Sequence, residues 1–281
     1  MVLSHKLRSI LSRVGTYSVL AVVSVLIIFP LFWMALTSFK SEVQLFSIPP
    51  IVLPEPFTLS NYETVLKNGS FVTYFGNSIY IALLTVGIST LLAIPAAYGL
   101  ARTHFYGSKL VTGLIIFMRM VPGITFCIPY YMLMRSLRLN NTHWALLVMY
   151  IPSQLLMSIW LMRNFFLSLP TELEDAADID GASLLRKIFA VVVPISLPSI
   201  TTAVLFAFLQ AWNEYLLATT MVRSPELWTM PMGMAAYTSA FRIYWGELMT
   251  NATLYTVPVI VFTVFAQKGL ISGLTVGAVK A

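Results

Sequence analysis

Charged residues are scarce in this chain of 281 residues: lysine, arginine, aspartate and glutamate make up 10% of it, whereas 58% is apolar. An ordinary soluble domain has roughly 25% charged residues, and a soluble core of this size could not bury so much apolar surface. We therefore expect lipid to cover much of the chain, as in an integral membrane protein. The net charge of +6 does not indicate nucleic-acid binding, because the basic residues are scattered along the sequence.

Residues for metal, redox or nucleotide chemistry are also lacking. The single cysteine, Cys127, excludes an intrachain disulfide, and the three histidines are too far apart for ligand spacing. The phosphate-binding pattern G-x-x-x-x-G-K-[ST] is absent, as are the nucleophile-elbow and zinc-protease motifs. We expect no cofactor, no metal and no catalytic activity in this chain itself.

Long apolar runs are what the sequence does have. A bilayer core of about 30 Å needs about 20 mostly apolar residues per helix, and each backbone must satisfy its own hydrogen bonds there. The sequence therefore predicts an all-α membrane protein of about six spans, with prolines tolerated as kinks. The predicted spans are 15–37, 72–100, 110–134, 143–163, 198–220 and 249–270.

The basic residues predict the orientation. Lys6, Arg8 and Arg13 precede the first span, and more lysines and arginines fall on that side of the membrane than on the other. Arg135 and Arg138 run against this bias. We expect the N-terminus in the cytoplasm and, after an even number of spans, the C-terminus there too.

The loop between the fourth and fifth spans is the most charged stretch. Thr171 and Glu174 have the spacing of a capping box, so a helix should begin at Thr171, and Gly181 is placed to end it in a left-handed conformation. Leu173, Ala176 and Ala177 share one face of this helix. A helix this short is marginal alone, so it should dock, either on a partner or on its own bundle.

This loop resembles the EAA loop of bacterial ABC importer permeases. The matching residues are Asp175-Ala176-Ala177, Asp180-Gly181-Ala182, Val192-Val193-Pro194 and Pro198, with aspartate at 175 in place of the usual glutamate. The resemblance implies the MetI-like fold of type I importers, and a coupling helix that fits a groove on a cytoplasmic ATPase. The coupling residues so implied are Glu174, Asp175, Ala176, Ala177, Asp180, Gly181, Ala182 and Pro194.

Three further stretches are similar to carbohydrate-importer permeases of the maltose type. They are Ala97–Gly107, Ala211-Trp212-Asn213-Glu214-Tyr215 and the C-terminal Gly269–Ala281. In that family the tail reaches into the ATPase interface, which would assign this role to Gly277, Val279 and Lys280. Taken together the resemblance covers about residues 70–281.

The implied function is that of a permease subunit moving a di- or oligosaccharide, or a sugar derivative, across the inner membrane by alternating access. The implied partners are a second homologous permease, two ATPase subunits that bind ATP–Mg, an extracytoplasmic sugar-binding protein and membrane lipid. Residues 1–70 would form the N-terminus, first span and first outer loop. Residues 71–281 would form the transmembrane domain, with the coupling loop at about 165–197 and a scoop-like loop at about 221–248.

Two other classes stay open on the residues alone. An ion-gradient-driven secondary transporter would have inverted repeats and paired intramembrane carboxylates, of which only Glu214 is plausible here. A polytopic membrane enzyme would need a catalytic cluster, and the sequence offers none.

Polar residues inside the predicted spans suggest a solute pathway, because charges in a membrane normally face the bundle interior. Arg119 interrupts the third span and Glu214 lies in the fifth. The expected pathway residues are Arg119, Trp212, Asn213, Glu214 and Tyr215. The alternative is an Arg119–Glu214 ion pair that only holds the bundle together. In the outer loop, the alternative to a scoop is an interfacial aromatic belt.

Overall fold

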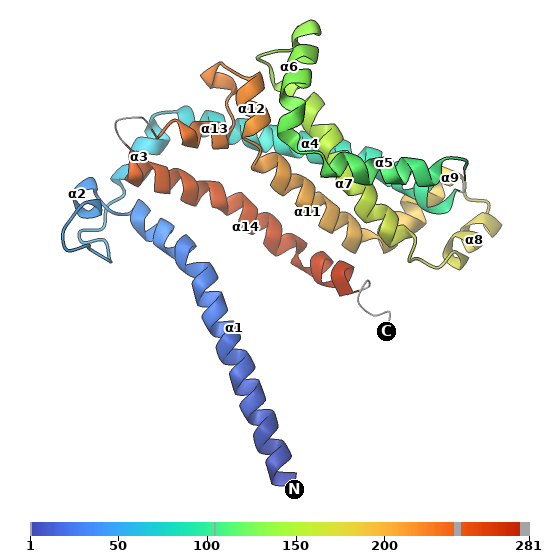
Figure 1. Cartoon of the computed structure of the whole chain (residues 1–281), viewed down its shortest axis with the longest axis horizontal. Coiled ribbons are helices and arrows are strands. Elements are labelled where there is room, and N and C mark those ends of the chain that lie inside the picture. The colour runs from blue at the N-terminus through green and yellow to red at the C-terminus, as the bar shows by residue number, and fades with distance from the viewer. Residues whose placement is uncertain (1, 104, 239–242, 276–281) are drawn as a thin grey trace. The chain divides into compact units, whose positions relative to one another are not determined.

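The computed structural model describes residues 2–103, 105–238 and 243–275 (Figure 1). Helices dominate this part of the chain, and its only strand-like pairing is an isolated bridge between Thr238 and Ile243. The chain divides into two compact units, Met1–Gly69 with Ala236–Thr256 and Ser70–Ala235 with Val257–Ala281. The division falls inside the last helix, α14 (Trp245–Thr275).

The first unit is built around the end of a long helix, α1 (Val2–Ser38), which is followed by α2 (Glu42–Leu45) and α3 (Ser60–Lys67). Asn61 ties α3 to the end of α1, because its Nδ2 donates to the carbonyls of Ser38 and Lys40 at 2.9 Å. The start of α14 approaches α3 closely: a Cβ on Gly246 would lie 2.7 Å from Oδ1 of Asn61. A side chain at position 246 would therefore displace the Asn61 amide from these hydrogen bonds.

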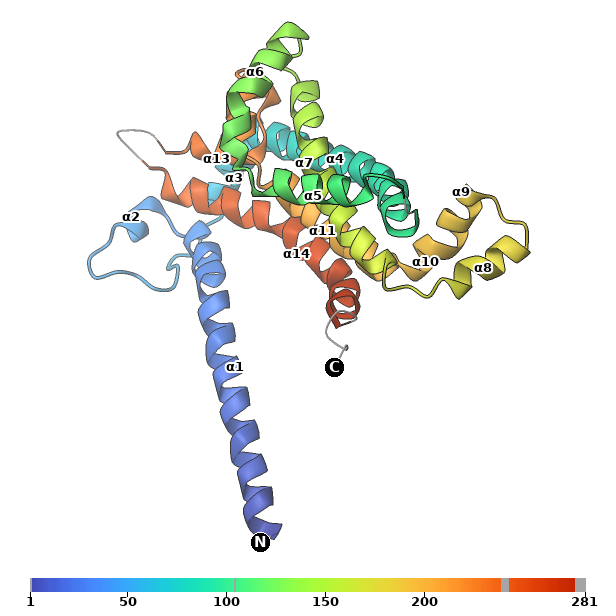
Figure 2. The same ribbon diagram turned by 45° about the vertical axis from the view of Figure 1, so that its right-hand side comes forward.

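The second unit has three helices at its centre, α4 (Ser70–Arg102), α7 (His143–Phe166) and α11 (Leu197–Trp212), which pack against one another (Figure 2). Ala93, Ala97 and Ala203 are fully buried between them. Small side chains let helix backbones approach closely, which is how helices associate where lipid removes the hydrophobic drive. The core of the unit is therefore a close helix–helix contact, filled out by Met162 and Phe166.

The unit also contains the C-terminal part of α14 and a set of shorter elements. They are α5 (Ser108–Met120), η1 (Gly123–Phe126), α6 (Cys127–Ser136), α8 (Glu172–Ile179), α9 (Leu184–Arg186), η2 (Lys187–Val192), α10 (Val193–Ile195), α12 (Leu216–Met221), η3 (Pro225–Leu227) and α13 (Met230–Ala235).

Within the described ranges, four helices are long and apolar enough to cross a membrane, and two bent pairs raise the number to six if each pair is one span. The first pair, 108–120 with 123–136, turns by 97° next to Pro122. Prolines also lie inside α1, α4 and α7 without ending them, as expected of membrane helices. The predicted all-α fold of about six spans is confirmed.

The predicted fifth span, 198–220, is wrong as a continuous helix. The helix α11 ends at Trp212, and α12 begins only at Leu216. The Oε1 atom of Glu214 accepts a hydrogen bond from the backbone nitrogen of Leu217 at 2.9 Å, so this carboxylate satisfies an N–H group in the first turn of α12. On its other side α11 is preceded by an 84° bend, and Pro198 lies in its first turn.

Candidate functional site

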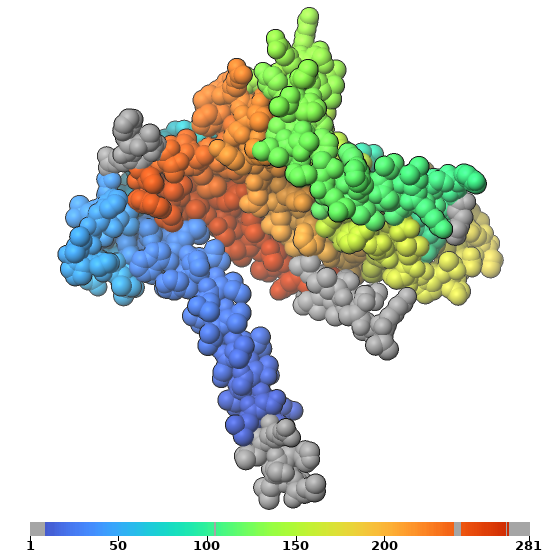
Figure 3. Space-filling model, in the orientation of Figure 1, coloured from blue at the N-terminus to red at the C-terminus, as the bar shows by residue number. Residues whose placement is uncertain are grey.

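The coupling segment predicted from the sequence is α8, which lies at one end of the second unit (Figures 1 and 3). The helix begins after Thr171 as expected, but the predicted capping box does not form. Thr171 itself has helical dihedral angles, and its side chain accepts no hydrogen bond from the helix. The partner expected for it, Glu174, turns instead toward α4.

Glu174 is held by two side chains from the end of α4. Nε of Arg102 lies 2.7 Å from one carboxylate oxygen of Glu174, and the hydroxyl of Tyr98 donates to the other at 2.6 Å. Nη2 of Arg102 also donates to the carbonyl of Leu169 at 3.1 Å. The Arg102 and Glu174 side chains are only 14% and 8% exposed. A carboxylate that is buried with both oxygens satisfied binds its helix firmly to its partner.

The end of α8 has the geometry that the sequence predicted. Gly181 has φ of +72°, in the left-handed region. Its backbone nitrogen donates to the carbonyl of Asp178, and that of Ala182 donates to the carbonyl of Ala177, both at 3.0 Å. These two bonds form a Schellman motif, which satisfies the last carbonyls of the helix.

The face that α8 presents outward differs from the expected one. Ala177 is buried against its own chain, at 8% exposure, because it lies one turn after the buried Glu174. Leu173, Ala176 and Ile179 are exposed, and Ile179 is 87% exposed. The prediction that Ala177 shares a free face with Leu173 and Ala176 is therefore wrong. The exposed stripe is Leu173–Ala176–Ile179, flanked by Asp175 and Asp180.

The segment after α8 connects this stripe to the core. Asp178 of α8 forms an ion pair with Lys187, with 2.6 Å between Nζ and Oδ2. Lys187 begins a π-helical turn, η2, whose Ile188 and Val192 side chains are each 2% exposed in the core. Such turns are rare and often occur at functional sites, and no residue pattern indicated this one in advance. Of the remaining predicted coupling residues, Ala182 is half-buried and Pro194 is exposed.

A cavity of about 580 Å³ lies in the second unit, between α5, α7, α11 and α12. Three of the predicted pathway residues line it: Arg119, Asn213 and Glu214. They come from the two places where spans break, the end of α5 and the gap between α11 and α12. The bends therefore bring together polar groups that lie almost 100 positions apart in the sequence.

The other two predicted pathway residues lie outside this cavity lining. Trp212 is 1% exposed and stacks on Phe208, with its ring edge against Phe75. Tyr215 is 45% exposed. Among the described residues no ion pair joins Arg119 to Glu214, so the two charges face the cavity without neutralising each other directly.

The cavity lining also contains side chains that sequence reasoning missed, and two glutamines and two of the aromatic rings matter most to its chemistry. They are Gln154, Gln210, Phe126 and Tyr130. Gln154 is only 5% exposed, and within the described chain its Oε1 atom has no hydrogen-bond partner. A buried amide without a partner is costly, so a ligand that donates to it would recover free energy. A polar glutamine within the apolar run of α7 was the available signal.

Chemically, this cavity suits a polyhydroxylated solute. Amide groups can both donate and accept hydrogen bonds, and the guanidinium and carboxylate add charge-assisted ones. Aromatic rings can pack on an apolar sugar-like face. The opposite charges of Arg119 and Glu214 together favour a solute without a large net charge.

The first part of the predicted scoop-like segment is held against α4 by hydrogen bonds. Nδ2 of Asn77 donates to the carbonyls of Glu226 and Trp228 at 2.9 Å, and the backbone nitrogen of Met230 donates to Oγ of Ser78 at 2.7 Å. These bonds fasten residues 226–230 to the start of α4. The scoop role stays a prediction, and the tail residues Gly277, Val279 and Lys280 lie outside the described residues.

Known proteins are similar to this chain in sequence and in fold. A family described as binding-protein-dependent transport system inner membrane component matches residues 89–276. SmoH, a sulfoquinovosyl glycerol transport system permease protein of Agrobacterium fabrum, is 35% identical over 253 residues, 90% of this chain and 89% of SmoH. DasC, a diacetylchitobiose uptake system permease protein of Streptomyces coelicolor, is 29% identical over 274 residues, 97% of this chain and 99% of DasC.

Among solved structures, a bacterial ABC transporter involved in the import of the acidic polysaccharide alginate contains a chain that superposes with a TM-score of 0.77. That match covers 91% of this chain and 95% of the other, at 23% identity. The likeness shows a shared fold across nearly the whole molecule.

Proposed function

Because the chain belongs to the family of binding-protein-dependent transport system inner membrane components, we propose that it is one permease subunit of an ATP-driven importer that moves a saccharide by alternating access. The observation that carries this proposal is α8, an exposed helix fastened to α4 through Arg102 and Glu174. Such a helix can transmit force from a partner to α4, which packs against α7 and α11, two of the helices that line the cavity.

The proposed docking surface is the exposed stripe Leu173–Ala176–Ile179 with its acidic flanks. Small and aliphatic side chains allow a close approach, and Asp175 and Asp180 can meet basic groups on the partner. The partner proposed here is an ATPase subunit that binds ATP–Mg, present in two copies. A second, homologous permease and an extracytoplasmic binding protein complete the assembly.

The proposed solute is a di- or oligosaccharide or a sugar derivative. The cavity supports this class because it combines buried and exposed amides, rings and an opposite pair of charges. SmoH and DasC are named for the transport of sugar-containing solutes, which agrees with this chemistry. In this chain Arg119, Gln154, Gln210, Asn213 and Glu214 would contact the solute.

Reconstitution of the purified complex in proteoliposomes tests the proposal. Labelled saccharide should accumulate only when ATP is enclosed with the ATPase subunits and the binding protein is supplied on the opposite side. Dissipation of ion gradients should leave the initial rate unchanged. Uptake driven by an ion gradient without ATP would overturn the assignment in favour of a secondary transporter.

A further inference from the structure

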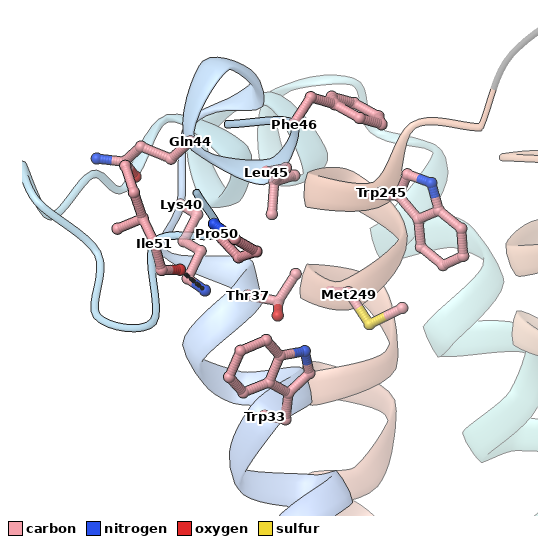
Figure 4. A pocket seen from close by; sticks show the side chains of 10 residues that line it. All are labelled: Trp33, Thr37, Lys40, Gln44, Leu45, Phe46, Pro50, Ile51, Trp245 and Met249. Atoms are coloured by element: carbon pink, nitrogen blue, oxygen red, sulfur yellow. Dashed lines mark hydrogen bonds between the residues drawn. The ribbon is translucent and has the colours of Figure 1, made fainter. Parts of the chain in front are cut away.

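A second cavity, of about 340 Å³, lies in the first unit, where the chain leaves α1 (Figure 4). Its walls are mostly apolar and come from α1, from the segment around α2 and from the start of α14. The residues that matter to its chemistry are Trp33, Thr37, Lys40, Ile51, Trp245 and Met249. None of the transport chemistry proposed above uses them.

Lys40 is a buried cation without a carboxylate partner. The residue is 3% exposed, and its Nζ donates to the carbonyl of Ile51 at 2.8 Å and lies 4.4 Å from the centre of the Trp33 ring. No carboxylate lies within 4.0 Å of this ammonium among the described residues. Burial lowers the pKa of Lys40, because the charged form loses hydration. An anion in the cavity would restore the lost stabilisation.

Thr37 supplies a second unsatisfied group on the same wall. It is 8% exposed, and its hydroxyl oxygen has no hydrogen-bond partner in the part of the chain that the structure describes. Thr37 lies three residues before Lys40, so both side chains lie on one side of the chain as α1 ends. The pair offers an ammonium and a hydroxyl donor at one place.

The position of this cavity identifies the kind of anion. The candidate spans that border it are Ser9–Ser38 and Trp245–Gln267, so it lies where both helices cross from hydrocarbon to water. Trp33 and Trp245 are the aromatic side chains typical of that level. The anions concentrated there are the phosphates of lipid headgroups, and the apolar walls can accept the attached glycerol and acyl atoms.

We propose that this cavity binds the phosphate of an anionic phospholipid, with Lys40 and Thr37 as donors to its oxygens. The binding goes beyond the transport function and holds whichever solute the complex carries. Inorganic phosphate offers the same oxygens but would leave the apolar walls unfilled. A lipid is therefore the occupant that matches both parts of the site.

Native mass spectrometry of the intact purified complex tests the proposal. The complex is delipidated and given phosphatidylglycerol, diacylglycerol with the same acyl chains, or inorganic phosphate alone. The complex without substitutions should retain phosphatidylglycerol and should not retain diacylglycerol at the same concentration. It should keep its phosphatidylglycerol when an equal concentration of inorganic phosphate is added.

Variants connect the retained lipid to this cavity. Lys40→Met should weaken retention about tenfold, the loss expected for a charge-assisted hydrogen bond, and Thr37→Val should weaken it several-fold. Lys40→Arg should keep the lipid because it keeps the charge. The matched control is Lys67→Met on the exposed surface of α3, where the Lys67 side chain is 77% exposed.

The alternatives give different results. Equal retention of diacylglycerol would show that the apolar walls alone bind, and displacement by equimolar inorganic phosphate would show a free-phosphate site; either result overturns the proposal. If the Lys40→Met complex fails to assemble, the Thr37→Val and Lys40→Arg variants test the proposal instead. Unchanged phosphatidylglycerol retention in Thr37→Val, together with loss of phosphatidylglycerol in Lys40→Arg, contradicts the assigned donors.

Discussion

Nε of Arg102, at the end of α4, lies 2.7 Å from the carboxylate of Glu174 in α8, although 72 positions separate the two residues in the sequence. The pair is buried, and Tyr98 satisfies the second carboxylate oxygen. One end of a central helix is thereby joined to the segment that we propose to dock on the ATPase. This joint lets a rotation of α8 become a movement of α4.

The first prediction concerns this joint. Arg102→Met leaves the Glu174 carboxylate buried without its charge partner, and breaking a buried pair in this way typically costs about 3–5 kcal/mol. We expect faster amide hydrogen exchange in residues 172–180. Saccharide uptake should fall at least about tenfold, because about 1.4 kcal/mol already corresponds to that factor. The complex should still assemble, since the exposed stripe is unchanged.

A double variant separates pairing from simple loss of a residue. Arg102→Met with Glu174→Met removes both charges. Its hydrogen exchange and saccharide uptake should be closer to those of the unsubstituted protein than in either single variant. Lys67→Met, in the exposed pair with Glu63, is the matched surface control and should have no effect. Normal uptake in Arg102→Met would show that the joint does not transmit force.

The second prediction uses two adjacent alanines of α8 that face opposite ways. Ala176→Leu adds bulk to the exposed stripe, so it should weaken ATPase retention during purification and lower uptake without changing thermal stability. Ala177→Leu adds the same bulk against the chain's own core, where overpacking costs about 1–3 kcal/mol. It should lower the melting temperature of the permease. If both variants retained the ATPase and transported normally, α8 would not be the docking element.

The third prediction concerns Gln154, whose buried Oε1 atom has no partner. Gln154→Leu should weaken saccharide binding by about tenfold through the loss of one hydrogen bond. It should leave thermal stability unchanged or raise it slightly, because an unsatisfied buried amide is removed. The measurement is the concentration dependence of uptake beside the melting temperature. Tyr215→Phe, outside the cavity lining, is the control, and equal effects of the two variants would contradict the assignment.

The fourth prediction concerns Glu214, which lines the cavity and accepts a hydrogen bond from the backbone nitrogen of Leu217 in the first turn of α12. Glu214→Gln keeps an oxygen that can accept from the nitrogen of Leu217, so α12 should form normally while the charge is lost. Uptake should decrease with ATPase docking intact. Glu214→Leu removes the acceptor as well and should also lower stability by about 1 kcal/mol, the typical net contribution of one hydrogen bond. Unchanged uptake kinetics in Glu214→Gln would remove this residue from the solute pathway.

Much of the fold could be predicted from short-range signals. Hydropathy gives the number of spans, and the left-handed turn at Gly181 follows from the residue type and its place after α8. The family match confirms the resemblance seen in the EAA-like loop. The predicted orientation of the termini and the role of the tail stay predictions, because they depend on the membrane and on partners.

The errors concern the direction in which side chains point and, in the fifth span, the continuity of a helix. The spacing of Thr171 and Glu174 fits a capping box, yet Arg102 and Tyr98 offer Glu174 a charge and a hydrogen bond that a backbone N–H cannot match. Apolar composition suggested an unbroken fifth span, whereas α11 ends at Trp212 and the carboxylate of Glu214 bonds to the first turn of a separate helix, α12. A local sequence pattern allows several hydrogen-bond partners for a side chain, and residues far away in the sequence decide which partner it binds.

By itself, the sequence determined that this chain is a membrane protein, that it is helical, and where the helix α8 begins and ends. These properties depend on hydropathy and on backbone preferences within a few residues. Only the tertiary structure decided that Ala177 is covered and Ala176 is free, and that Arg119 and Glu214 share a cavity with Gln154. The physical reason is that burial and pairing depend on how helices far apart in the chain pack together, and no local window of residues contains that information.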